Sequence, residues 1–244
     1  MRQNGKQVRF FPRVSKINAH GLEAFMKFGL FVSAVAGIAV CAASATAQVC
    51  QGDLAFRSST HLGAALAMTD HTTSFGGGAA WGHRQGLYGG ASVGILNYDA
   101  GVGNAVAVGG GVGYQMPLQA RSNWQLCPGG TLSLSFGPNS NGAKISTQTL
   151  TMGASTGTSV PLSKSVNLLP YASAAFAHTR LAVSANGASN SASDNYLLLG
   201  FGAGFQLTPN FVLRPSLQLA AATDNPDDTT FGLSMTFALP HRGR

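Results

Sequence analysis

The chain has 244 residues, of which only 9% are charged, against about a quarter in ordinary soluble domains. Its 45% hydrophobic content excludes a disordered chain, because disorder combines few apolar residues with high net charge. The 32 glycines do not indicate collagen, since the sequence has no Gly-X-Y period and only 10 prolines. The formal charge of +7 supports a nucleic-acid partner only if the basic residues lie in the folded part of the chain.

Residues 1–47 are predicted to be an N-terminal extension and a cleaved secretory signal peptide. A basic start precedes an apolar or small run over residues 28–43, and Ala45-Thr46-Ala47 supplies the small residues that a signal peptidase reads. The run is short for a membrane-spanning helix, which needs roughly 20 apolar residues, so cleavage is favoured. An uncleaved anchor is the alternative. Translation starts at Met1 or at Met26.

Most of the positive charge lies in this leader. Residues 1–47 contain six basic residues and one acidic residue, for a charge of +5, which leaves nine basic and seven acidic residues, or +2, in residues 48–244. We therefore expect no nucleic-acid partner.

From about His61 onward, apolar residues alternate with small or polar ones, which is the period of a β-strand. In the last such segment, Phe231, Leu233 and Met235 alternate with a glycine, a serine and a threonine. Ten segments share this pattern, and in chain order they are 62–68, 75–82, 87–95, 106–116, 124–136, 150–160, 168–176, 197–207, 211–219 and 231–239.

The residues that alternate with the apolar ones, on the other face of each strand, distinguish a β-sandwich from a β-barrel. A soluble secreted β-sandwich that acts as a binding module shows charged residues on its outer face. Here the second face carries Gly, Ala, Ser, Thr and Gln, which suits the interior of a narrow barrel whose apolar face meets lipid. We predict that residues 48–244 form one closed antiparallel transmembrane β-barrel of about 10 strands, within a range of 8–12. The sandwich is the alternative.

The charges test this strand scheme, because they were not used to draw it. With an even strand number and a periplasmic start, six of the seven acids in residues 48–244 fall in outside loops, and the exception is Asp53. The basic residues mostly fall on the periplasmic side. The longest predicted outside loop is the polar stretch 184–195, and the periplasmic turns are short, as in outer-membrane barrels.

The chain resembles the small outer-membrane β-barrel proteins of Gram-negative bacteria, the OmpA-like and opacity-like group. The resemblance rests on the Ala45-Thr46-Ala47 exit, on the turn 207–211 followed by Leu213-Arg214-Pro215, and on the final strand 231–239. It covers the whole of residues 48–244. The chain departs from the group by adding seven residues after Phe237, where members usually end on an aromatic residue that the insertion machinery reads.

Cys50 and Cys127 are predicted to form a disulfide, because Cys41 lies in the leader and an exported chain meets an oxidising compartment. The bond would hold the N-terminal segment against the periplasmic mouth of the barrel. Two free thiols are the alternative. By strand parity, five larger polar side chains point into the lumen and would line a passage or a hydrogen-bonded plug: Gln115, Gln125, Gln206, Arg214 and Gln218.

Two further sites are alternatives. Some outer-membrane barrels hydrolyse lipids with a Ser/His/Asp set, and here His71 beside Asp70, or His178, could serve at the outer rim. Asp224, Asp227 and Asp228 offer hard oxygen ligands for a divalent cation in a loop, without the glycine and glutamate of an EF-hand. We expect a solvated acidic loop, no metal, no cofactor and no enzymatic activity.

The predicted function is that of an integral barrel of the bacterial outer membrane, exported through a Sec-type signal. We expect a structural or cell-surface interaction role, with a narrow passive pore as a variant and a lipid hydrolase as the alternative. The expected partners are outer-membrane lipids, lipopolysaccharide and, during assembly, the insertion machinery.

Overall fold

We describe a computed structural model of the chain. It covers residues 49–54, 60–82, 86–99, 103–118, 123–140, 143–185, 188–221 and 229–239.

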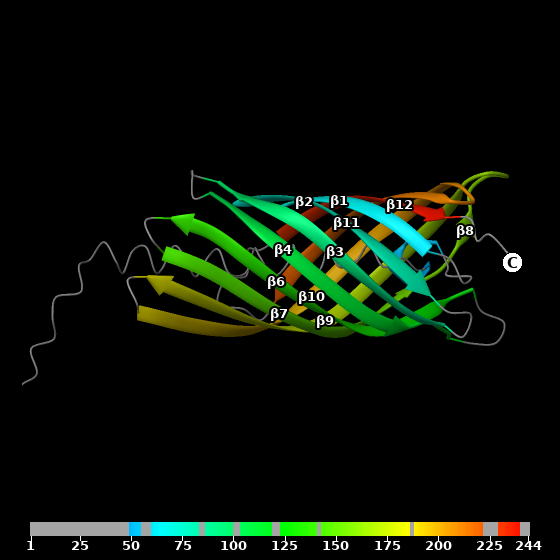
Figure 1. Cartoon of the computed structure of the whole chain (residues 1–244). Helices are drawn as coiled ribbons and strands as arrows, with labels where there is room; N and C mark the ends of the chain where they lie inside the picture. Colours follow the sequence, from blue (N-terminus) through cyan, green and yellow to red (C-terminus); the bar gives the residue numbers. More distant parts are fainter. Residues whose placement is uncertain are drawn as a thin grey trace, which may run out of the picture.

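Ten long strands form a closed antiparallel barrel (Figure 1). Neighbours in the chain pair with each other, and the barrel closes where β12 pairs with β1. Two strands of two residues each, β5 (Met116–Pro117) and β8 (Val160–Pro161), extend the sheet beside β6 and β9. The long strands are β1 (Thr60–Met68), β2 (Thr72–Gly82), β3 (Leu87–Tyr98), β4 (Gly103–Tyr114), β6 (Gln125–Ser140), β7 (Ala143–Gly157), β9 (Asn167–Ala185), β10 (Ala188–Thr208), β11 (Phe211–Ala221) and β12 (Thr229–Leu239). The predicted all-β barrel of ten strands is confirmed, and the sandwich is excluded.

The two faces of the barrel differ as the alternation predicts. On β12, Phe231 and Met235 are 64% and 49% exposed, whereas Thr230 and Thr236 point inward and are each 2% exposed. Large apolar side chains cover the outer surface in the same way on the other strands, for example Phe75, Val112 and Phe201. The barrel thus turns its apolar side chains outward and its small and polar ones inward.

The prediction of a long loop over residues 184–195 is wrong. β9 continues to Ala185 and β10 begins at Ala188, so the two strands stay paired almost to the tip of their hairpin. β6 and β7 likewise extend to Ser140 and from Ala143. These four strands project past their neighbours at one end of the barrel (Figure 1). The sequence hides the extension, because polar residues such as Ser191 and Asn195 face outward there in place of apolar ones.

The opposite end contains the short N-terminal helix η1 (Val49–Gln51), the start of β1 and the end of β12 (Figure 1). Within the described ranges, no helix is long and apolar enough to cross a membrane.

Candidate functional site: the closed barrel mouth

The segment Val49–Leu54 lies inside the barrel mouth at this end. Its first anchor is a disulfide between Cys50 and Cys127 of β6, whose Cα atoms are 6.0 Å apart. Both cysteine side chains are buried. The predicted pairing is therefore present in the structure, and it attaches the segment to the barrel wall where we expected it.

Arg214 anchors the segment to the other side of the wall. It lies on β11, which three strands separate from β6 in the sheet order. Its Nη1 donates a hydrogen bond to the backbone carbonyl of Gln51 at 2.7 Å, and its Nε donates one to Ser234 Oγ at 3.0 Å. The guanidinium carbon also lies 5.8 Å from the ring centroid of Tyr171, within cation–π range. The disulfide and Arg214 together hold the segment across the lumen.

Asp53 is the third anchor. Its Oδ2 accepts a hydrogen bond from Thr236 Oγ1 on β12 at 2.6 Å, and its Oδ1 accepts one from the backbone N–H of Leu54 at 2.7 Å. The segment precedes the first membrane-spanning strand, and the Asp53 side chain is fully buried. Burial raises the pKa of the Asp53 carboxyl, while the charge of Arg214 and the hydrogen bonds act in the opposite direction.

Glycines on the wall make room for the segment. A Cβ on Gly204 of β10 would lie 1.8 Å from the carbonyl oxygen of Gly52, and one on Gly157 of β7 would lie 2.4 Å from that of Val49. Gly52 itself has a φ of +73°, a left-handed conformation that glycine adopts without strain. Backbone therefore packs directly on backbone at the mouth.

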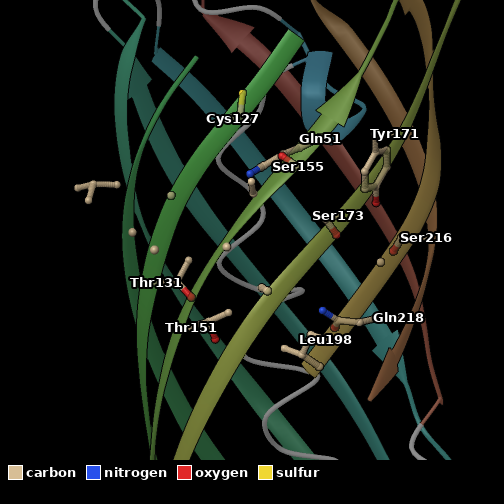
Figure 2. A pocket seen from close by; sticks show the side chains of 18 of the residues that line it. Gln51, Cys127, Thr131, Thr151, Ser155, Tyr171, Ser173, Leu198, Ser216 and Gln218 are labelled. Carbon is tan, nitrogen blue, oxygen red and sulfur yellow. The ribbon is translucent and has the colours of Figure 1, made fainter. Parts of the chain in front are cut away.

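A cavity of about 130 Å³ continues from the segment into the lumen (Figure 2). The polar side chains of Gln51, Arg214 and Gln218 line it, together with many small residues and a few large ones, among them Tyr88 and Tyr171. Within the described part of the chain, the buried Gln51 Oε1, Thr151 Oγ1 and Ser155 Oγ have no hydrogen-bond partner. A cavity of this size has room for water, because one water needs only about 10–15 Å³, and these three oxygen atoms offer it polar partners.

The five predicted lumen residues fall into two groups. Arg214 and Gln218 line the cavity. The other three lie at the mouth: the amide of Gln115 donates to Gln125 Oε1, and Asn167 Nδ2 donates to Gln206 Oε1 at 2.9 Å. A role of these residues in lining a passage stays a prediction.

The two candidate catalytic histidines lie in different parts of the barrel, one in a turn and the other on a strand. His71 lies in the exposed turn between β1 and β2. His178 faces outward on β9, and its Nδ1 lies 2.8 Å from Asn195 Oδ1, an amide oxygen where a catalytic set would need a carboxylate. Asp224, Asp227 and Asp228 lie outside the described residues. In the parts of the chain that the structure covers, no three His, Cys, Asp or Glu side chains are grouped to hold a metal.

Sequence reasoning missed Asp53, Gln51, Tyr171 and Thr236 as parts of the mouth. One signal was available. Asp53 was the only acid of residues 48–244 that the strand scheme placed on the periplasmic side, and it follows Cys50 by three residues.

Residues 33–238 match the family described as outer membrane protein beta-barrel domain. The chain belongs to this family. Members of the outer membrane protein β-barrel domain family are integral proteins of the bacterial outer membrane, so the predicted location is confirmed. The match begins within the predicted leader, and cleavage after Ala47 stays a prediction. No curated protein matches the sequence significantly.

Solved structures with the same kind of barrel share little sequence with this family member. Ail, the attachment invasion locus protein of Yersinia pestis, is 17% identical, with 74% of this chain and 97% of Ail covered and a TM-score of 0.42. The N-terminal β-barrel domain of Pseudomonas aeruginosa OprF is 15% identical, with 75% and 98% covered and a TM-score of 0.36. The outer membrane protease OmpT from Escherichia coli is 8% identical, with 76% and 99% covered and a TM-score of 0.45. Similarity at this level carries no functional argument.

Proposed function

We propose that the protein is a structural, surface-interacting barrel whose lumen is closed by its own N-terminal segment and whose tall side projects from the cell. The end with Val49–Leu54 faces the periplasm, and the extension of β6, β7, β9 and β10 faces the exterior. Long outer strands and short inner turns are the usual asymmetry of outer-membrane barrels.

One observation carries the proposal. Along β9 and β10 the outward side chains change abruptly from apolar to polar, while the strands continue. Phe176 and Leu197 are exposed and apolar, whereas the next outward residues, His178 and Asn195, are exposed and polar and bond to each other. Lipid therefore ends at this level, and the paired strands beyond it form a rigid sheet in water for contact with other surface molecules.

A narrow passive pore is the second candidate, supported by the cavity behind the segment and by the polar side chains of Gln51, Arg214 and Gln218 that line part of it. The three anchors favour closure over conduction, because they bind Val49–Leu54 to strands on different sides of the mouth. A lipid hydrolase receives no comparable support, since His178 is bonded to an amide. Outer-membrane lipids are the partners of the apolar band, and assembly would use the insertion machinery of the membrane.

Topology and conduction test the proposal separately. A Ser191→Cys variant adds one thiol on the projecting sheet, and Lys164→Cys adds one in the turn between β8 and β9 at the other end. In intact cells, a membrane-impermeant maleimide should label the first variant and should label the second only after permeabilisation. The reverse pattern would overturn the orientation. Steady single-channel steps from the wild-type protein in planar bilayers would overturn closure and support the pore.

A further inference from the structure

A group of polar and basic side chains lies on the outer surface immediately above the apolar band. We call it the rim patch. All of its members face outward and are exposed: Lys144 and Gln148 of β7, His178 and Arg180 of β9, and Ser193 and Asn195 of β10. On β9, His178 and Arg180 are the first two outward positions past Phe176, which is 55% exposed. The patch thus begins where the lipid-facing surface ends.

The strand register surrounds Arg180 with hydrogen-bonding side chains. Gln148 pairs with it across β7, and Ser193 pairs with it across β10. Directly paired residues have Cβ atoms about 4.5–5.5 Å apart, so an anion held by Arg180 lies within reach of both. The rigid strands fix these positions, in contrast to a loop.

Lys144 adds a second permanent charge on the same face. It pairs with Ser184, four residues beyond Arg180 on β9, or about 13 Å along the strand. The outward residues between them, Ser146 and Ala182, are small and leave room for the long lysine and arginine side chains to approach a shared ligand. The face therefore presents two cations over a surface without bulky side chains.

The described acidic side chains at this end of the barrel lie away from the rim patch. Asp70 lies in the turn that follows β1, on the opposite side of the barrel from β7 in the sheet order. Asp99 lies in the turn that follows β3, and the strands β4 and β6 separate β3 from β7. Asp194 has the strand parity of the buried Tyr196 and so faces inward. Among the described residues, no carboxylate shares the face of Lys144 and Arg180, and this face is positively charged.

We propose that the rim patch binds phosphate groups of the phosphorylated glycolipid of the outer leaflet, lipopolysaccharide. The lipid chains lie against Phe176 and its apolar neighbours, which places the headgroup phosphates at the level of Arg180. The planar guanidinium donates two parallel hydrogen bonds to phosphate, Gln148 and Ser193 add neutral donors, and Lys144 adds charge. The site rests on the orientation proposed above and not on whether the barrel conducts.

The test uses the full-length protein refolded in detergent without lipopolysaccharide. Fluorescent lipopolysaccharide is titrated in its phosphorylated and its phosphatase-treated forms. Wild-type protein should bind the phosphorylated form at least about tenfold more tightly, and the Lys144→Gln/Arg180→Gln variant should lose this preference. Arg180→Lys should keep part of it, because it retains the charge and loses the fork geometry. Lys164→Gln, which removes one positive charge at the other end of the barrel, should bind like wild type.

Each other outcome overturns the proposal. It is wrong if the double variant folds, as judged by heat-modifiable gel mobility, and still prefers phosphorylated lipid. It is also wrong if Lys164→Gln loses the preference equally, which would indicate unspecific attraction. If inorganic phosphate displaces the lipid as well as unlabelled lipopolysaccharide does at equal concentration, the patch is a site for soluble anions. The reverse labelling pattern in the maleimide experiment would overturn the proposed orientation of the barrel. It would leave the lipopolysaccharide affinities measured in detergent unchanged, so the two results are distinguishable.

Discussion

Replacing Gly204 by alanine should loosen the segment that closes the barrel mouth. The added Cβ would lie 1.8 Å from the Gly52 carbonyl oxygen, and side-chain carbons essentially never approach other atoms closer than 3.0 Å. The carbonyl must therefore move by at least about 1.2 Å. The neighbouring carbonyl of Gln51 moves with it and leaves the 2.7 Å hydrogen bond from Arg214. The barrel strand has less freedom to yield, because Gly204 pairs with Leu169 of β9, and Gly202 and Phe205 on either side of it pair with β11.

The cost of overpacking a close contact of this kind is about 1–3 kcal/mol. If the segment alone absorbs that cost, its local opening becomes about 5- to 150-fold more frequent. Hydrogen exchange of a peptide covering Val49–Leu54, followed by mass spectrometry in detergent micelles, measures this opening directly. Exchange of the β10 peptides should change little, because the strand stays in the barrel.

Gly200→Ala is the matched control. It lies on the same strand and also faces the lumen, but its new Cβ would first meet Ser173 Oγ, a hydroxyl that can rotate away. In Gly200→Ala, the backbone amides of Val49–Leu54 should exchange hydrogen at the wild-type rate. Equal protection of the segment in Gly204→Ala and wild type, with both folded, would refute the reasoning that backbone contact holds the mouth closed.

Four other changes test the remaining features. Replacing Cys50 and Cys127 by serine should lower the free energy of unfolding by about 4 kcal/mol in the entropic model for a sequence separation of 77. Urea titration with and without reductant measures this difference. Equal unfolding midpoints for the variant and the oxidised wild-type protein would contradict the prediction. Arg214→Gln should destabilise the segment by about 1.5–3 kcal/mol, seen as faster hydrogen exchange, since it removes charged hydrogen bonds to Gln51 and Ser234. Folding raises the pKa of the Asp53 carboxyl above 3.8, so the contribution of Asp53 to stability is complete below pH 3.8 and is lost as the pH rises through the pKa of the folded state. Hydrogen exchange of the segment, corrected for intrinsic rates, should therefore show weaker protection at pH 8 than at pH 4. In Asp53→Asn the protection should differ less between the two pH values. Phe201→Arg should cost about 2–4 kcal/mol in a lipid bilayer, whereas Asn195→Arg should cost close to nothing; similar costs would place the edge of the lipid elsewhere.

The strands could be recognised from the sequence only where their two faces have different surroundings, lipid on one side and the narrow lumen on the other. On β12, lipid selects Phe231 and Met235 outside, and the narrow lumen selects Ser234 and Thr236 inside, so the period of two is plain. On the outer half of β10, water replaces lipid outside, and Ser191 and Ser193 carry no alternating signal. The stretch was therefore predicted as a loop, although its backbone pairs with β9 throughout.

The same physics explains how much of the site could be predicted. Strand parity placed Arg214 in the lumen, and the two cysteines were paired because only two remain after the leader. The partner of Arg214 was out of reach, because Gln51 is separated from it by 163 residues and meets it only through closure of the barrel. The alternation of apolar and polar residues does not indicate that the short segment Val49–Leu54 enters the barrel mouth.

Asp53, the one acid of residues 48–244 that the strand scheme did not place in an outside loop, is the residue in the sequence that pointed to the barrel mouth. A chain in a low-dielectric membrane keeps charges at its two ends, where water solvates them, or pairs them with polar groups inside. Asp70 and Asp99 follow the first rule in exposed turns at one end. Asp53 breaks the sorting because it follows the second: it is fully buried at the other end, bonded to Thr236 and within the field of Arg214. In this barrel with few charged residues, the acidic residue that departs from the sorting therefore marks a buried contact in the lumen.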